Sequence, residues 1–431
     1  MAQPPGKSQS FQAPTGTRDF YPIELARRRF IEDAWRKVSI RHGFDEIDGP
    51  TFEHLDLYTV KSGEGIVSEL FSFQRAGGEK TYALRPEFTP TLARLYAANA
   101  GSLAKPTKWF WQSTCFRAER PQRGRLREFV QWNVDHLGGE SRPDADAEVI
   151  ACIIDLLATS GLSPQQIRVK IGDRNVAAAM LRTSGVAEDC VDLGLAILDR
   201  RAKLPAEVIQ KQAGELGLDL TKFDQQAIAA VSGQAGGNGA FADLAALRSR
   251  LDSAGLGEWV QFDFNIARGL AYYTGMVFEV LVDGERAIAG GGRYDNLIEL
   301  FGGPSTPAVG FGFGDVVFSL VLQDKKLMLS DKEIARSLGL RPDAFVISNG
   351  TPESDVQLTP ILAALRRRGM HARRSYRTTK NIGKLLKEAS DADARFAIII
   401  ESSAEITLKN LDDGTQDKGP AEMLLARITA H

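Results

Sequence analysis

The sequence predicts an α+β protein, in which an antiparallel-sheet domain with a helical insertion is followed by a small α/β domain. Three observations support this prediction: two strand-like runs joined by a charged loop, an Ala/Leu-rich helical stretch in the middle, and alternating strand and helix patterns near the end. The 431 residues are enough for two or three domains. The expected boundaries are 1–325 for the first domain, with the insertion at about 175–258, 326–342 for a linker, and 343–431 for the second domain.

The composition is that of an ordinary globular protein, with 43% hydrophobic and 25% charged residues and a net charge of −2. A site for a polyanion must therefore be a local patch. Three cysteines without a C-x-x-C pair argue against a disulfide framework and favour a cytoplasmic location. The five histidines are too scattered for a structural metal site. No apolar run reaches the ~20 residues of a membrane span, and residues 1–14 are typical of a loose tail rather than a signal peptide.

The first elements follow from periodicity. Ile31, Trp35 and Val38 recur at helical spacing, so we expect a helix from Glu24 to Ile40 that ends at Gly43. An extended segment from 44 to 51 should follow. A second helix is expected to begin at Thr89-Pro90, with proline at its first position, and to run through Tyr96.

The next two elements are strands, Trp109–Arg117 and Phe129–Leu137, joined as a hairpin with Gly124 near the tip. Alternation on the second strand separates a polar face from an apolar one, and the polar face is predicted to line a cavity. Its residues are Gln131, Asn133 and Asp135, against Val130, Trp132 and Val134 on the other side.

The loop of this hairpin is rich in arginine. It carries only two acidic residues, Glu119 and Glu128, against Arg117, Arg120, Arg123, Arg125 and Arg127. The guanidinium fork suits phosphate oxygens, so the loop is expected to bind a phosphorylated ligand. The alternative is a solvated hairpin with surface charges.

Beyond residue 175 the chain is helical and is broken by a glycine-rich stretch at 232–239. A strand pattern returns at Tyr272–Val282. After the polar linker, strand and helix patterns alternate over four segments, namely Ala344–Ser348, Pro360–Arg368, Phe396–Ile400 and Ile406–Leu411.

The hairpin segment from Phe116 to Arg125 resembles motif 2 of class II aminoacyl-tRNA synthetases, in the form that histidyl-tRNA synthetases carry. Five further segments are similar to that family and occur in its order along nearly the whole chain. They are Gly16-Thr17-Arg18-Asp19-Phe20, Pro50, Leu84-Arg85-Pro86-Glu87-Phe88-Thr89, Arg268-Gly269-Leu270-Ala271-Tyr272-Tyr273-Thr274-Gly275 and Gly290-Gly291-Gly292-Arg293-Tyr294-Asp295.

The resemblance implies that the protein activates histidine with ATP to histidyl-adenylate and pyrophosphate, and then transfers histidine to the 3′-terminal adenosine of its tRNA. It also implies Mg²⁺, whose ligands the sequence leaves open, with Glu and Asp side chains near the phosphates as candidates. Arg117 would hold the α-phosphate, Glu119 and Arg125 would contact the nucleotide, and Phe129 would stack near the adenine. Arg268 resembles the family's catalytic arginine; the alternative is a structural salt bridge.

Histidine selection requires polar groups around the imidazole and the α-amino group. By position, the resemblance assigns this pocket to Glu87, Thr89, Gln131, Asp135, Arg268, Tyr272, Tyr273 and Tyr294. Thr89 is also a candidate helix N-cap. Tyr272 and Tyr273 alternate faces, so one of them is a candidate core residue. The glycines at 290–292 suit close approach of a ligand to the backbone, although a plain turn would use them too.

The sequence departs from the family pattern at two positions. The segment from Gly310 to Val317 resembles motif 3, which ends in an arginine that contacts ATP, but Val317 stands at the expected arginine. Ala271 replaces an acidic residue common in the histidyl signature. Loss of the arginine should weaken ATP binding unless another cation substitutes for it.

The second domain carries a concentrated basic run. From Arg366 to Lys387 there are nine Lys/Arg and no Asp/Glu, with Tyr376 among them. Such a run suits contact with a phosphate backbone, and the alternative is a solvated helix face. By resemblance this is an anticodon-binding domain, and the helical insertion would lie near the acceptor stem.

The resemblance further implies a homodimer whose interface comes from Glu24 to Pro50, and no association with membranes. The rival interpretation is a non-catalytic paralogue that senses histidine, such as the regulatory subunit of ATP phosphoribosyltransferase. Those proteins typically lack the second domain and lose the ATP-binding arginines. The chain keeps the basic second domain together with Arg117, Arg125 and Arg268, which favours the ligase, whereas only Val317 favours the rival. A nucleotide-binding protein of another fold is a more distant alternative.

Overall fold

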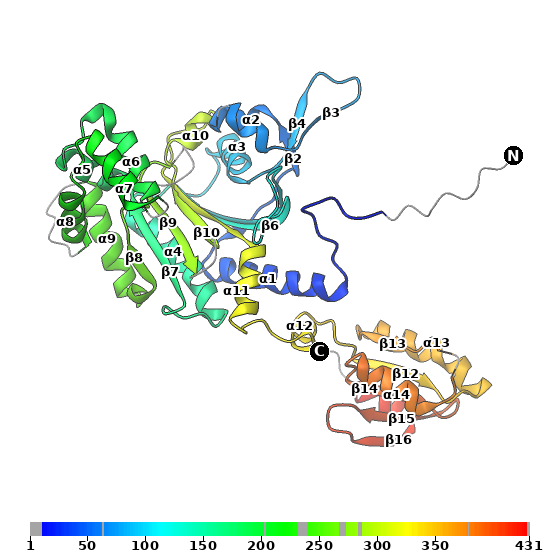
Figure 1. The fold of residues 1–431 in the computed structure, drawn as a ribbon. Coiled ribbons are helices and arrows are strands. Elements are labelled where there is room, and N and C mark those ends of the chain that lie inside the picture. Colours follow the sequence, from blue (N-terminus) through cyan, green and yellow to red (C-terminus); the bar gives the residue numbers. More distant parts are fainter. Residues whose placement is uncertain are drawn as a thin grey trace. The chain divides into compact units, whose positions relative to one another are not determined.

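The computed structural model of the chain describes residues 11–62, 64–201, 204–231, 239–266, 273–282, 287–377 and 379–428 (Figure 1). They form two compact units. The larger consists of Ile31–Met328 with the segment that ends at Asp19, and the smaller consists of Phe20–Phe30 with the chain from Leu329 onward. Each unit has its own cluster of buried apolar residues, as expected for structural domains.

An eight-stranded sheet forms the centre of the larger unit, in the order β1-β5-β6-β11-β10-β9-β7-β8. Neighbouring strands are antiparallel except at the two edges, where β1 pairs with β5 and β7 pairs with β8 in parallel. The predicted α+β class with an antiparallel central sheet is therefore confirmed. In sheet order the strands are Asp45–Glu46, Thr107–Phe116, Glu128–Leu137, Ala308–Gly314, Ala289–Arg293, Met276–Val282, Ile167–Asp173 and Val260–Phe262.

The predicted hairpin is β5 and β6, which pair along ten residues each. The strand expected from Tyr272 is shorter than predicted, because β9 begins at Met276. The extended segment at 44–51 contributes only the two residues of β1 to this sheet.

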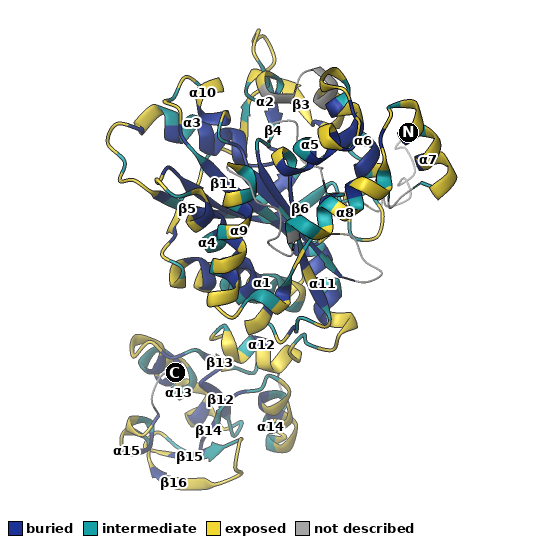
Figure 2. Cartoon of the chain, turned by 90° about the vertical axis from the view of Figure 1, so that its left-hand side faces the viewer, coloured by how far each residue is buried: buried dark blue, intermediate teal, exposed yellow. Residues whose placement is uncertain are grey.

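Helices cover one face of the sheet: α1 (Pro22–Arg41), α4 (Arg142–Thr159) and α11 (Asp315–Asp324). The core lies between them and the strands, which are buried while the outer helix surfaces are exposed (Figure 2). Trp35 of α1 stacks on Trp132 of β6 with ring centroids 6.0 Å apart. The apolar side of β6 is therefore the core side, as the alternation predicts, and its polar side faces the opposite way.

The opposite face carries α3 (Thr89–Asn99) and α10 (Leu297–Leu300). Beside them lies a small sheet in the order β2-β4-β3, formed by Phe52–His54, Thr81–Leu84 and Ser72–Gln74, with α2 (Asp56–Ser62) and the 3₁₀ helix Glu64–Glu69.

The predicted N-cap of α3 is wrong by one residue. Phe88 is the N-cap, no side chain caps the helix, and Thr89 and Pro90 are its first two residues. The reason is tertiary, since Phe88 stacks on Trp111 with centroids 4.3 Å apart and nearly parallel rings. Thr89 is thus available for another role.

Five helices lie between β7 and β8 and group together in Figure 1. They share a core of their own that includes Met180, Leu195 and Phe223. Their bounds are Arg174–Thr183 (α5), Val191–Arg200 (α6), Ala206–Glu215 (α7), Leu220–Val231 (α8) and Ala240–Ser253 (α9), with 3₁₀ turns at Glu188–Cys190 and Gly257–Trp259.

The smaller unit is built on a five-stranded sheet in the order β13-β12-β14-β15-β16. Its strands are, in that order, Ala372–Arg374, Ala344–Ser348, Phe396–Ile400, Glu405–Asn410 and Gln416–Pro420. The helices are α12 (Asp331–Ser337), α13 (Pro352–Arg367), α14 (Ile382–Asp391) and α15 (Ala421–Ala426). The segment expected to be a linker, 326–342, contains the helix α12, which begins with a capping box of Ser330 and Glu333.

Candidate active site

A surface of glycines forms the floor of the site. In the register of β10 and β11, Gly290 pairs with Gly312 and Gly292 pairs with Gly310. A Cβ on Gly310 would lie 2.1 Å from Asp135 Oδ1, and one on Gly312 would lie 2.3 Å from Gln131 Nε2. These two glycines therefore let the polar side chains of β6 lie across the neighbouring strand.

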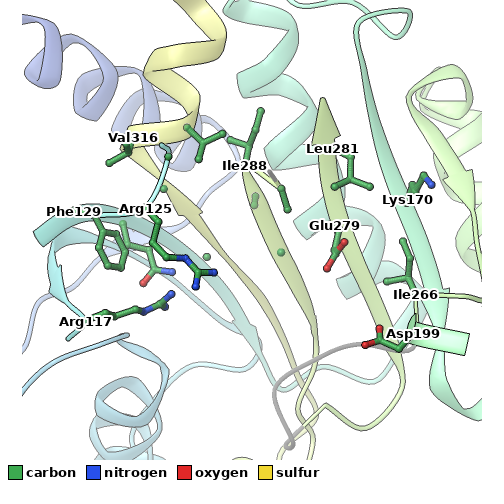
Figure 3. A pocket seen from close by; sticks show the side chains of 18 of the residues that line it. Arg117, Arg125, Phe129, Lys170, Asp199, Ile266, Glu279, Leu281, Ile288 and Val316 are labelled. Carbon is green, nitrogen blue, oxygen red and sulfur yellow. The ribbon is translucent and has the colours of Figure 1, made fainter. Parts of the chain in front are cut away.

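Two cavities meet over this floor. The large cavity, of about 740 Å³, extends from Arg117, Arg125 and Phe129 at one end to Lys170 and Asp199 at the other (Figure 3). The small cavity, of about 380 Å³, is lined by Glu87, Thr89, Gln131, Asn133, Asp135, Tyr273 and Tyr294. Five residues line both, namely Arg117, Gln131, Glu279, Gly290 and Gly312. A ligand group at this junction would be in reach of both compartments.

Arg117 is held at the junction by its neighbours. Its Nε donates to the carbonyl oxygen of Pro86 at 3.1 Å, and its guanidinium carbon lies 5.1 Å from the centroid of the Phe129 ring. These contacts fix the arginine above the cavity, where its remaining N–H groups suit an anion.

The other arginines of the hairpin loop differ in whether they line the large cavity or bond to other parts of the chain. Arg125 lines the large cavity and pairs with Glu119 at 2.5 Å. Arg123 instead pairs with Asp324 of α11 at 2.8 Å, and Arg127 donates to the carbonyl oxygen of Glu119. The turn needs a glycine, because Gly124 has φ +76°. The loop is therefore partly structural, and Arg117 and Arg125 are its cavity-lining cations.

The N-terminal segment that contains Gly16 and Arg18 is held against this hairpin by hydrogen bonds. The carbonyl oxygen of Gly16 accepts from the backbone N–H of Arg127 at 2.9 Å. Arg18 donates to Asp315 Oδ2 at 2.7 Å, and Asp315 Oδ1 accepts from the N–H of Val130 at 2.9 Å. Asp315, at the start of α11, thus joins three distant segments, and sequence reasoning had given it no role.

Asp135 and Tyr294 form the polar end of the small cavity. The Tyr294 hydroxyl donates to Asp135 Oδ1 at 2.5 Å, and both residues are buried. Burial raises the pKa of Asp135 to about 7, although the Tyr294 hydrogen bond opposes this shift. Asp135 Oδ2 is buried and takes no hydrogen bond from the described residues, so it is an acceptor suited to a ligand N–H.

Gln131 is oriented by a thiol. Cys115 on β5 is buried, which raises its pKa to about 12 and keeps it protonated. Its Sγ donates to Gln131 Oε1 at 3.4 Å, while the amide nitrogen lies over Gly312. The Gln131 N–H groups are therefore directed to the junction of the two cavities. The other cysteines, Cys152 and Cys190, are also free thiols.

Glu87 and Thr89 are brought to the small cavity by a buried arginine. Arg85 is 2% exposed and donates to the carbonyl oxygens of Thr114 and Gly49 at 2.9 and 3.0 Å. Its guanidinium also lies over the Trp111 ring at 4.6 Å. Because Arg85 anchors its segment, the two following polar residues have a defined position.

The structure brings together most of the predicted site residues. The large cavity is lined by three of the assigned residues, Arg117, Arg125 and Phe129. The small cavity is lined by Glu87, Thr89, Arg117, Gln131, Asp135, Tyr273 and Tyr294. Glu119 reaches the site through its ion pair with Arg125. Arg268 and Tyr272 lie outside the described residues, so their roles stay predictions.

Sequence reasoning missed several lining residues. Asn133 had been put on the polar face of β6 but was not assigned to the pocket. Glu279 of β9 lines both cavities, and Lys170 and Asp199 line the far end of the large one. Strand alternation around Glu279 was the available signal, whereas the approach of Asp199 depends on tertiary packing.

Val317, at the position of the expected arginine, lines the large cavity and is 7% exposed. A Cβ on Gly124 would lie 3.1 Å from its Cγ2. The side chain thus fills the angle between the hairpin turn and α11 with apolar atoms. Over the described ranges, no cluster of three His, Cys, Asp or Glu side chains could hold a metal ion, and no helix is long and apolar enough to span a bilayer.

The basic run of the smaller unit is partly used within the unit. Arg366 donates to the carbonyl oxygen of Ala372, and Arg368 donates to those of Leu425 and Ile428. Arg374 lies over the ring of Tyr376 at 4.4 Å, and that ring is 79% exposed. Lys380, Lys384 and Lys387 are exposed as well. An exposed cation–aromatic surface therefore remains at this edge of the sheet.

Comparison with known proteins points to the same family by two routes, a family model and individual relatives. The family model described as histidyl-tRNA synthetase matches residues 16–314. Histidine–tRNA ligase of Opitutus terrae is 36% identical, over 97% of this chain and 98% of that protein. Histidine–tRNA ligase of Pyrococcus abyssi is 34% identical over 96% and 97%.

Solved structures share the fold. The histidyl-tRNA synthetase of Nostoc has a TM-score of 0.77 at 22% identity, covering 98% of this chain and 99% of that one. A Bacillus halodurans protein titled as an ATP phosphoribosyltransferase regulatory subunit/histidyl-tRNA synthetase has a TM-score of 0.71 at 24% identity, covering 91% and 99%.

Proposed function

The chain belongs to the histidyl-tRNA synthetase family, whose members join histidine to tRNA with ATP, and we propose that its two cavities divide this reaction between ATP and histidine. The observation that carries the proposal is the shared lining of the cavities. Arg117 and Gln131 border both compartments, where a carboxylate from one side can meet a phosphate from the other.

The large cavity is proposed to hold ATP. Arg117 neutralises the α-phosphate, Arg125 and Glu119 contact the nucleotide, and Phe129 stacks on the adenine. The pairing of Arg125 with Glu119 at 2.5 Å supports this assignment, because it holds the guanidinium at the cavity. Val317 adds apolar surface near the hairpin turn, so phosphate binding depends on the hairpin arginines and on the predicted Arg268.

The small cavity is proposed to hold histidine. Asp135 accepts an imidazole N–H through Oδ2 while Tyr294 holds Oδ1 at 2.5 Å. Glu87 and Thr89 lie nearby and bind the α-amino group, and Gln131 donates to the carboxylate. Buried polar groups that the right ligand satisfies, and a wrong one leaves unpaired, give strong selection.

The placement of histidine beside the α-phosphate of ATP then allows histidine to be activated. The histidine carboxylate attacks the α-phosphorus, the bond to the β-phosphate oxygen breaks, and pyrophosphate leaves. Arg117 compensates the charge that develops on the α-phosphate oxygens, and its fixed position lowers the cost of reorganisation. In the second step a ribose hydroxyl of the terminal adenosine attacks the acyl carbon and AMP leaves.

Mg²⁺ is proposed as the ion that accompanies ATP. It commonly takes one or two carboxylates plus phosphate oxygens. Glu279 supplies a carboxylate in the lining of the large cavity, and Glu119 lies beside that lining through its ion pair with Arg125. These residues fit the ion, whose charge would offset that of the departing pyrophosphate.

The remaining assignments concern tRNA and assembly. We assign the smaller unit to the anticodon, supported by its exposed basic edge and Tyr376, and the five-helix module to the acceptor stem. A homodimer built on Glu24–Pro50, a cytoplasmic location and the absence of membrane association complete the proposal.

The experiment for the overall function is ATP-dependent transfer of labelled histidine to tRNA by the purified protein. Transfer of histidine and of no other amino acid is expected. The regulatory paralogue would bind histidine and transfer none. The Arg117 and Arg125 side chains at the cavity favour the ligase over that rival.

A further inference from the structure

Asn133 carries a buried oxygen with no partner in the small cavity. The residue is 3% exposed, and its Oδ1 takes no hydrogen bond from any part of the chain that the structure describes. Most buried side-chain polar atoms have a partner, and leaving one without costs free energy. An orphaned acceptor that lines a cavity is therefore a candidate contact for a ligand N–H group.

The position of Asn133 on β6 indicates which group of the ligand donates the hydrogen bond. Gln131, Asn133 and Asp135 follow one another on one face of the strand, each about 6.6 Å beyond the last. Gln131 lines both cavities, and Asp135 lines the small cavity alone, beside Tyr294. If the carboxylate of histidine lies at Gln131 and its ring at Asp135, the middle of the substrate lies opposite Asn133.

The middle of histidine is the α-carbon with its ammonium group. That group has three N–H donors and requires three acceptors when buried. Glu87 and Thr89 offer two acceptors at the same cavity, being 8% and 6% exposed. The carbonyl oxygen of Asn133, which lines the same cavity, provides a third.

We propose that Asn133 is a further specificity residue, whose carbonyl oxygen accepts a hydrogen bond from the α-ammonium group of histidine. This inference rests on the proposed assignment of the small cavity to histidine. It adds a contact from β6 to the recognition of the amino group, which the proposed function assigns to Glu87 and Thr89. Asn133 is uncharged, so it adds an acceptor without placing another carboxylate beside Asp135.

The test compares histidine with imidazolepropionate, which keeps the ring and the carboxylate but lacks the amino group. Calorimetry on the full-length protein gives the preference of each variant for histidine over this analogue. We expect Asn133→Ala to reduce that preference about tenfold, the usual effect of one lost hydrogen bond to a charged group. Binding of imidazolepropionate should stay within about twofold of wild type.

The matched control is Ser39→Ala. Ser39 Oγ is buried on the far side of β6, where it accepts from Trp132 Nε1 at 2.9 Å. Ser39 lies on α1, so this variant removes a buried hydrogen bond to β6 on the core side of the strand and away from the cavity, and both affinities should be unchanged.

Equal losses for both ligands in Asn133→Ala would overturn the proposal, since they would indicate a contact with the ring or a purely structural effect. An unchanged preference would overturn it as well. If the wild-type protein binds histidine and imidazolepropionate equally, this inference fails while the assignment of the cavity to histidine stands; if it binds neither, the proposed assignment of the cavity fails.

Discussion

The Tyr294 hydroxyl donates a hydrogen bond of 2.5 Å to Asp135 Oδ1 in the lining of the small cavity. The second carboxylate oxygen is left without a partner among the described residues, and burial raises the pKa of Asp135 to about 7. The carboxyl that we propose to accept the imidazole N–H therefore titrates close to neutral pH, which makes two predictions possible.

The first prediction concerns pH and histidine binding. Only the ionised carboxylate is a full acceptor for an imidazole N–H, so the KM for histidine should fall as pH rises from about 6 to about 8 through the Asp135 pKa. Pyrophosphate exchange at saturating ATP measures it. The free histidine ring titrates in the same range, so Asp135→Asn provides the baseline. An equal pH dependence in both proteins would refute the role of Asp135.

The second prediction concerns stability. A raised pKa in the folded state means that the contribution of Asp135 to stability is present below its ordinary pKa and is lost as pH rises to about 7. Asp135→Asn removes the buried charge and keeps an acceptor for Tyr294. Its melting temperature at pH 8 should exceed that of wild type by roughly 2–4 °C, with the difference shrinking towards pH 4. Asp146 and Asp173, whose pKa values burial also raises, are common to both proteins. A variant that is less stable at pH 8 would contradict the linkage.

The third prediction separates two arginines of the hairpin loop. Arg125 lines the large cavity, whereas Arg123 pairs with Asp324. Because Val317 supplies no cation, Arg125→Ala should raise the KM for ATP roughly tenfold to a hundredfold, as expected for a lost charged hydrogen bond. Arg123→Ala is the matched control and should change it less than about twofold. Steady-state exchange kinetics in ATP distinguish the two. Similar effects would mean that the loop acts only through its net charge.

The fourth prediction concerns the smaller unit. Arg374 lies on β13 and Lys418 on β16, at opposite edges of the five-stranded sheet. If the exposed edge with Tyr376 contacts tRNA, Arg374→Ala should raise the KM for tRNA in aminoacylation and lower the salt dependence by about 0.9 log units per log salt. Exchange without tRNA should not change. Lys418→Ala should leave both assays unaltered, and a matching loss in that variant would remove the case for a defined edge.

Much of the architecture was predictable because the relevant signals are local. Alternation along β6 separates Trp132 from Asp135, and both occupy the predicted sides of the sheet. The capping box of Ser330 and Glu333 is also a local signal, although the linker interpretation overlooked it.

The remaining features depend on contacts between distant residues. Thr89 is not the cap of α3 because Phe88 stacks on Trp111, a contact that no local pattern contains. Asp315 bonds the N–H of Val130 across 185 positions. Whether the Asn133 Oδ1 finds a hydrogen-bond donor depends on its neighbours in the folded state. The alternation along β6 therefore predicted only the side of the strand on which Asn133 lies.

The central claim is that the two cavities activate histidine with ATP although the chain has Val317 where the family's motif 3 carries arginine. Histidine-dependent exchange of labelled pyrophosphate into ATP, with the other amino acids as controls, tests it most directly. We predict exchange with histidine alone and its loss in Arg117→Ala. Absence of exchange in a wild-type protein that still binds histidine by calorimetry would contradict the claim and would favour a histidine-sensing paralogue.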